Sequence, residues 1–317
     1  MMQSNGVPNL PLDVPLELPP DLPENLPASL SVDLPTTLAA ELPLLLELWQ
    51  SSCGWQPDIA QHQQFQHLYA QILDGNQRLN LTRITEPTEF WEKHLWDSLS
   101  GLMPFLGAAN RQIEAESESG AGSESGAESE TETGVSAIDP PMTLGQLPSP
   151  FSVIDIGTGA GFPGIPVAIA FPDATVTLLD STRKKIAFID SMLVALELSN
   201  AKTWVERVEQ IGQQRQHRGA YDVALLRAVA PATVCAEYAL PLLSANGLAI
   251  LYRGQWTADE ETALEGAIAQ LGGRLEHVAQ FTTPLSQSQR HCLYLRKVAP
   301  TPGQFPRAVG VPSQLPL

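Results

Sequence analysis

Hydrophobic and polar residues follow two different patterns along this chain, and the change comes near residue 150. Before that point the spacing is helical. Residues 41–74 carry helical patterns around LPLLLELWQ and HQQFQHLYAQILDG, and in the latter Phe65, Leu68, Tyr69 and Ile72 recur on one helical face. Another helix is predicted over 87–105, where Pro87 suits a first helical turn and apolar side chains again share faces.

From residue 151 onward, short apolar runs alternate with helical stretches. The runs are FSVIDIG (151–157), TVTLLD (175–180), AKTWVE (201–206), YDVALLRA (221–228), LAILYRG (248–254) and CLYLRKV (292–298). This alternation predicts an α/β fold, a doubly wound parallel sheet with helices on both faces. The stretch FTTPLSQSQRHCLYL offers only a loop between two short apolar runs, so we expect an antiparallel pair at the end of the sheet.

Two segments match neither pattern. Residues 1–40 repeat Leu-Pro steps, which forbid a continuous helix or strand ladder, and are predicted to be a disordered leader, with a docking motif as the alternative. Residues 111–150 consist largely of Glu, Ser and Gly and are predicted to be a disordered acidic insertion. The remaining chain divides into a helical cap at 41–110, an α/β domain at 151–300 and a tail at 301–317.

The net charge of −17 is concentrated in two places. Residues 1–50 and 111–150 hold 15 of the 35 acids but only one of the 18 bases, so the rest of the chain carries only −3. The total charge therefore does not exclude a nucleic-acid partner. Three scattered cysteines, without metal-site spacing, predict free thiols in a reducing compartment and no metal. No secretory signal or membrane span is visible, and we expect a cytoplasmic protein.

The stretch FSVIDIGTGAGFPGIPVAIA (151–170) predicts a cofactor loop between a strand and a helix. Gly159, Gly161 and Gly164 satisfy the GxGxxG fingerprint of dinucleotide sites. Asp155, two residues before Gly157, would repel a pyrophosphate but attract a cation. S-adenosylmethionine, which has a sulfonium and an ammonium but no phosphate, fits this arrangement better. An NAD-dependent oxidoreductase remains the alternative.

Further polar residues follow the next two predicted strands. Asp180 ends the second strand, where an acid can accept both ribose hydroxyls of either cofactor. Val208 and Glu209 follow the third strand, where an adenine could meet an apolar surface and a polar edge. Alternatively, Val208 is a packed residue and Glu209 an acid at a helix start.

Six motifs in order give a more specific indication: NLTRI (80–84), KHLWDSL (93–99), VIDIGTGAGFPGIPVAI (153–169), LLDSTRKKIAFI (178–189), RVEQ (207–210) and LLRAVAP (225–231). In these motifs the chain resembles the 16S ribosomal RNA guanine-N7 methyltransferases, also called glucose-inhibited division protein B. The resemblance covers roughly residues 50–105 and 150–298. The leader and the acidic insertion depart from the family pattern.

The resemblance implies a Rossmann-like, S-adenosylmethionine-dependent methyltransferase sheet with a small helical N-terminal cap. It also implies methyl transfer to N7 of one guanine in small-subunit ribosomal RNA. Guanine N7 carries an in-plane lone pair, so in-line displacement needs positioning and no general base. The cofactor contacts implied by the family are Gly157, Phe162, Asp180, Ser181, Thr182, Val208, Glu209 and Arg227.

Arg227 is the best candidate for a donor to guanine O6, although it could instead contact the cofactor. Asn80 and His94 are candidates for shaping the catalytic site or contacting RNA, and His94 could equally be a packed helix residue. Candidate phosphate contacts are Arg183, Lys184, Lys185, Arg207, Arg253 and Arg290. The expected partner is 16S rRNA or the small ribosomal subunit, bound by a monomer. A methyltransferase for a small molecule or protein, and a non-catalytic RNA-binding protein, remain alternatives.

Overall fold

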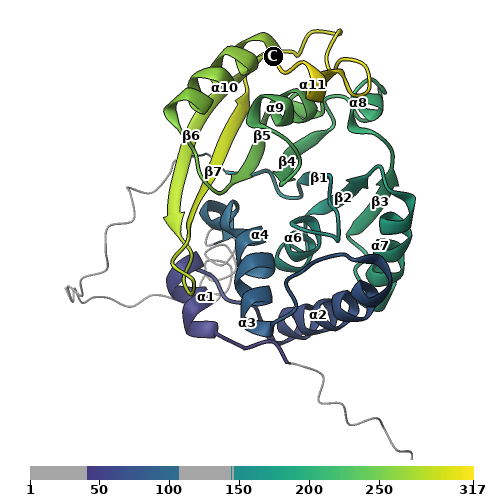
Figure 1. Cartoon of the computed structure of the whole chain (residues 1–317), viewed down its shortest axis with the longest axis vertical. Coiled ribbons are helices and arrows are strands. Elements are labelled where there is room, and N and C mark those ends of the chain that lie inside the picture. Colours follow the sequence, from purple (N-terminus) through teal and green to yellow (C-terminus); the bar gives the residue numbers. More distant parts are fainter. Residues whose placement is uncertain (1–40, 107–143, 145) are drawn as a thin grey trace, which may run out of the picture. The chain divides into compact units, whose positions relative to one another are not determined.

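The computed structural model describes residues 41–106, 144 and 146–317 (Figure 1). The predicted leader and most of the predicted acidic insertion lie outside the described residues. Residues Ala40–Leu317 form one compact unit. The described part of this unit contains the predicted sheet and the predicted N-terminal helices.

The sheet has seven strands within the described residues, in the order β3-β2-β1-β4-β5-β7-β6. Strands β1 to β5 are parallel, and β7 is antiparallel to both β5 and β6. This confirms the predicted doubly wound sheet and its final antiparallel pair. The strands are β1 Ser152–Ile156, β2 Thr175–Asp180, β3 Ala201–Val205, β4 Tyr221–Arg227, β5 Leu243–Arg253, β6 Gly273–Thr282 and β7 Gln289–Lys297.

Helices cover both faces of the sheet, as predicted (Figure 1). Alternate residues of each strand point to opposite faces: Val153 packs with α1–α4, α6 and α7, whereas Ile154 packs with α8–α10. The N-terminal helices thus share one core with the sheet. The helical segments are α1 Leu46–Cys53, α2 Ile59–Leu79, α3 Pro87–Phe90, η1 Trp91–Trp96, α4 Asp97–Ser100, α6 Gly164–Ala170, α7 Arg183–Ala195, α8 Val208–Ile211, α9 Ala232–Ala239, α10 Ala258–Leu271 and α11 Val311–Gln314.

The helix predicted over 87–105 differs from a regular α-helix in its middle. Its segments α3, η1 and α4 follow one another without a break, and η1 is π-helical. The predicted apolar face is buried throughout. A π-turn widens the backbone spiral and often occurs at a functional site. Here the carbonyl of Lys93, within η1, accepts a hydrogen bond from Arg227 at the end of β4, at 3.1 Å.

Residues 301–317, predicted as a tail, lie against the helical face formed by α8 and α9. Arg218 donates hydrogen bonds to the carbonyls of Thr301, Pro302 and Phe305, and the Phe305 ring is buried in the same core as α9. The folded α/β region also begins before residue 150, because the Leu144 side chain is buried and its carbonyl accepts a hydrogen bond from Arg296. Both ends of the α/β region are therefore longer than the apolar pattern indicates.

Candidate functional site

The glycine loop connects β1 to α6 at the carboxyl edge of the sheet. Gly157, Gly159 and Gly161 have φ values of 73°, 62° and 101°, which side chains with a Cβ rarely adopt. The amides of Gly157 and Thr158 donate to the carbonyl of Leu179, at 2.8 and 3.0 Å. The loop is thus fixed to the end of β2, in the crevice where open α/β sheets bind ligands.

Asp155 lies beneath this loop and is fully buried. Its Oδ2 accepts hydrogen bonds from Thr158 Oγ1 at 2.6 Å and from the Gly164 amide at 2.8 Å. Its Oδ1 is buried and has no hydrogen-bond partner among the described residues. Burial raises the pKa of Asp155 to about 6. The structure therefore assigns Asp155 to holding the loop, and its contact with a cationic ligand stays a prediction.

Asp180 links the loop to the turn after β2. Its Oδ2 accepts from the Gly159 amide at 3.1 Å, and its Oδ1 accepts from the Thr182 amide at 2.8 Å. Lys185 Nζ lies 3.8 Å from Oδ2. The structure thus brings the predicted ribose acceptor, the Ser181–Thr182 turn and the glycine loop together.

Glu209 lies in α8, where the buried Val208 is the first residue. Glu209 Oε1 accepts from Arg207 Nη2, Tyr238 OH and the Gly310 amide, at 2.9, 3.3 and 3.0 Å. Burial alone would raise the pKa of Glu209, but the hydrogen bonds from Arg207 and Gly310 hold it below its usual value. This carboxylate is therefore charged at neutral pH, although it is almost entirely buried.

Arg227, at the end of β4, lies at the centre of a cluster of side chains. The other members are His94 and Asp97 from the N-terminal helices, Phe162 from the glycine loop and Arg290 from β7. Arg227 Nη1 donates to Asp97 Oδ2 at 2.8 Å, and its guanidinium carbon lies 5.6 Å from the centroid of the Phe162 ring. Arg290 Nε, on β7, lies 3.5 Å from Asp97 Oδ1. Asp97 thus holds two of the predicted cationic site residues, one on each of its oxygens.

His94 belongs to the same cluster. Its ring stacks on Phe162, with centroids 4.5 Å apart and an interplanar angle of 12°. Arg227 Nη2 lies 3.5 Å from Nδ1, and Thr82 Oγ1 lies 2.8 Å from Nε2. Because Arg227 can only donate, Nδ1 is the acceptor and Nε2–H donates to Thr82. Burial, followed by the charges of Arg227 and Lys93, lowers the pKa of His94 to about 3. The imidazole is thus neutral at pH 7.

The sequence patterns missed Asp97, although it lies in the quoted motif KHLWDSL. Its position one helical turn after His94 would have placed both side chains on the same helix face. Asn80 is less closely connected to the cluster than expected. It is exposed and ends α2 with φ 48°, a conformation that Asn adopts readily, and no hydrogen bond joins its side chain to the cluster within the described chain.

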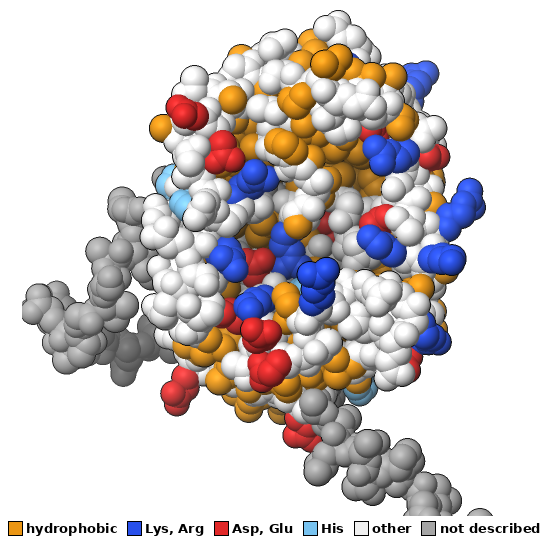
Figure 2. Space-filling model, in the orientation of Figure 1, with side chains coloured by type: hydrophobic (Ala, Val, Ile, Leu, Met, Phe, Trp, Pro, Cys, Tyr) orange, Lys and Arg blue, Asp and Glu red, His pale blue; other side chains and the backbone are white. Residues whose placement is uncertain are grey.

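The predicted phosphate contacts fall into two groups. Lys185, Arg207, Arg253 and Arg290 each pair with a carboxylate, whereas Arg183 and Lys184 are exposed and have no ion pair in the described regions. Figure 2 shows Lys and Arg side chains around a hollow in one face of the molecule, with several acidic side chains among them. We call these Lys and Arg side chains the basic rim.

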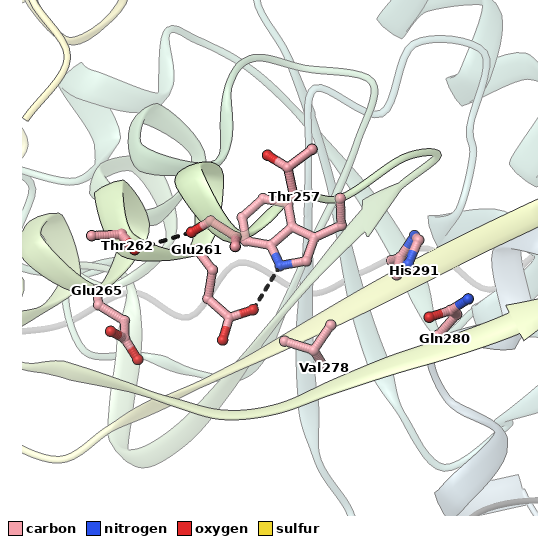
Figure 3. A pocket seen from close by; sticks show the side chains of 9 residues that line it. Thr257, Glu261, Thr262, Glu265, Val278, Gln280 and His291 are labelled. Carbon is pink, nitrogen blue, oxygen red and sulfur yellow. Dashed lines mark hydrogen bonds between the residues drawn. The ribbon is translucent and has the colours of Figure 1, made fainter.

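A separate recess lies between α10 and the strands β6 and β7 (Figure 3). Glu261 and Glu265 line it from α10, and Val278, Gln280 and His291 line it from the strands. Trp256 Nε1 donates to Glu261 Oε2 at 3.0 Å, so this carboxylate is already engaged. None of the predicted site residues lines this recess, so the glycine loop and the Arg227 cluster remain the candidate site.

Comparisons with known proteins identify the family of this chain. A family model described as "GidB: rRNA small subunit methyltransferase G" matches residues 61–123 and 142–293. The chain is 55% identical to "Ribosomal RNA small subunit methyltransferase G" of Nostoc punctiforme over 87% of this chain and 98% of the relative. It is 56% identical to the protein of the same name from Trichormus variabilis, with the same coverage.

Several solved structures have a distant likeness to this chain. One is titled "Crystal Structure of antibiotic-resistance methyltransferase Kmr". It is 15% identical, with a TM-score of 0.41, over 48% of this chain and 88% of that chain. A likeness this weak supports no conclusion about function. The sequence matches cover both the N-terminal helices and the sheet, and they show that this chain is a member of the rRNA small subunit methyltransferase G family.

Proposed function

We propose that this protein transfers a methyl group from S-adenosylmethionine to N7 of a specific guanine in 16S ribosomal RNA. One observation carries the proposal. In a chain of this family, the Arg227, His94, Phe162 and Asp97 cluster lies directly beside the glycine loop. The relatives are named as small-subunit rRNA methyltransferases, and this chain is similar to them over nearly their whole length.

The residues present fit S-adenosylmethionine better than a dinucleotide. The buried Asp155 Oδ1 is an unpaired anionic atom beneath the loop, which would repel a pyrophosphate and favour a cation. When bound, the cofactor supplies an electrophilic methyl group on a positively charged sulfur. The residues that would hold it are Asp155, Gly157, Gly159, Gly161, Phe162, Asp180, Ser181, Thr182, Val208 and Glu209, with Arg227 at the reacting end.

The protein residues act by positioning. Guanine N7 already has a lone pair, so no side chain has to remove a proton, and the neutral His94 agrees with such a reaction. Lys93 and Asp97 occupy Nη1 of Arg227, and His94 Nδ1 accepts from Nη2. The second Nη2 hydrogen and the Nε hydrogen are therefore the donors to offer to guanine O6. The His94–Phe162 stack forms a flat wall between η1 and the loop. Asn80 would serve at the edge of this site.

The basic rim would hold the RNA backbone. Arg183 and Lys184, at the start of α7, are available for phosphates, and Lys185, Arg207, Arg253 and Arg290 could exchange their carboxylate partners for them. This rim favours RNA over a small-molecule substrate. Among the described residues no helix is long and apolar enough to cross a membrane. We further propose that the protein works as a monomer in the cytoplasm, on 16S rRNA or the small subunit.

The test is labelled methyl transfer from S-adenosylmethionine to small subunits from cells that lack this protein, followed by mapping of 7-methylguanosine. Incorporation at a single guanine is expected, with none from heat-inactivated protein. Absence of transfer, with an unrelated active rRNA methyltransferase working in the same assay, would refute the proposal. Transfer to a protein or small molecule alone would place the enzyme in another substrate class.

A further inference from the structure

The C-terminal segment, residues 301–317, is held against α9 by a buried ion pair. Glu237 of α9 is fully buried, and it accepts from the amide, Nε and Nη2 of Arg307, at 2.6 to 3.1 Å. A buried carboxylate is stable only when paired in this way. The segment begins beyond residue 293, where the match to the family model ends.

This anchored segment reaches a predicted cofactor residue. The amide of Gly310 donates to Glu209 Oε1 at 3.0 Å, and Arg207 and Tyr238 donate to the same oxygen. Glu209 Oε2 is also buried but has no hydrogen-bond partner among the described residues. All three donors thus converge on one oxygen of the carboxylate. The other oxygen is left as an acceptor without a donor, which is an unfavourable state for a buried charge.

A ligand donor would satisfy that oxygen. In the proposed function, on which this inference rests, Glu209 lies at the adenine end of the cofactor, and the exocyclic amino group of adenine is a hydrogen-bond donor. We propose that the C-terminal segment positions Glu209 for this amino group, with Gly310 as the positioning residue and Arg307 as the anchor. The segment then contributes to adenine recognition through Glu209, without contacting the reacting atoms.

The experiment compares two ligands that differ at this amino group. S-adenosylhomocysteine carries it, and S-inosylhomocysteine has a carbonyl oxygen in its place. Their dissociation constants are measured by calorimetry on the full chain. Gly310→Pro removes the amide donor. Gly310→Ala keeps this donor but strains the backbone, because φ is 82° at this position, so it controls for backbone strain alone. Val309→Ala changes the neighbouring side chain, which is half exposed, and serves as the control.

The wild-type protein is expected to prefer S-adenosylhomocysteine by about tenfold or more, as a hydrogen bond to a charged group implies. Gly310→Pro should reduce this preference to about twofold while affinity for S-inosylhomocysteine stays the same. Val309→Ala should keep the preference, and Gly310→Ala, which retains the amide, should lose less of it than Gly310→Pro. A merely structural role would weaken both ligands equally.

Three results would overturn the positioning role: an unchanged preference in Gly310→Pro, equal loss of both ligands, or no preference in the wild type. Methyl transfer by the wild type is measured alongside. If rRNA is methylated but the preference is absent or insensitive to Gly310, only this inference fails. If the wild type neither binds S-adenosylhomocysteine nor methylates rRNA, the proposed function fails and the inference fails with it.

Discussion

Replacement of Asp97 by Asn should lower kcat/KM for the RNA substrate while leaving the affinity for the cofactor nearly unchanged. Asp97 is mostly buried, and its two oxygens hold Arg227 at 2.8 Å and Arg290 at 3.5 Å. Asn keeps the shape but removes the charge. A hydrogen bond between charged groups contributes about 1.5–3 kcal/mol, so losing the stronger one corresponds to roughly a 10- to 100-fold fall in rate. We expect this loss in kcat/KM for the RNA substrate.

The assay is methyl transfer to undermethylated small subunits, with the affinity for S-adenosylhomocysteine measured separately by calorimetry. Affinity should change by less than about threefold, because the substitution leaves Asp155, Asp180 and Glu209 untouched. Asp74→Asn is the matched control, since its carboxylate pairs with Arg78 at an exposed position. Wild-type kcat/KM in a folded Asp97→Asn protein would show that Arg227 needs no such support, and our account of the cluster would be wrong.

Three further predictions concern the loop, its pH dependence and the basic rim. Gly157→Val should abolish methyl transfer, because φ is 73° and a Cβ would lie 2.9 Å from Val229. The control Gly266→Ala, in α10, should retain activity, and retained activity in Gly157→Val would contradict the loop's role. Because burial raises the pKa of Asp155 from 3.8 to about 6, the folded state binds this proton more tightly than the unfolded state. The free energy of unfolding should therefore fall by about 2 kcal/mol as pH rises from 4 to 7, and urea titrations of Asp155→Asn should lack this fall. Lys184→Ala should weaken 16S rRNA binding and lower the slope of log affinity against log salt by about one, and an unchanged slope would remove this residue from the interface.

The apolar pattern predicted most of the sheet because its central strands are buried on both faces and leave near-continuous apolar runs. Strand β6 gave a weaker indication: GRLEHVAQFT lies at the sheet edge and is only partly buried, so charged residues interrupt its pattern. The glycine loop was also visible, since a backbone at positive φ restricts the residue type directly.

The missed features depend on contacts between distant segments. Asp97 and Arg290 are joined only by the fold, and no local pattern relates an acid in a helix to a base on β7. Likewise, residues 301–317 are rich in Pro and polar residues, which resembles an unstructured tail. Their packing depends on Arg307 meeting the buried Glu237, a partner that periodicity cannot reveal.

The position of β7 has a consequence for the order of events during synthesis. This strand lies between β5 and β6, although β6 precedes it in the chain. It also carries Arg290, which contacts Asp97 from the N-terminal helices. A nascent chain that ends before residue 289 therefore leaves β5 and β6 without their common neighbour and the Arg227 cluster incomplete. Methyl-transfer competence should consequently appear late and all at once, which keeps unfinished chains from acting on their substrate.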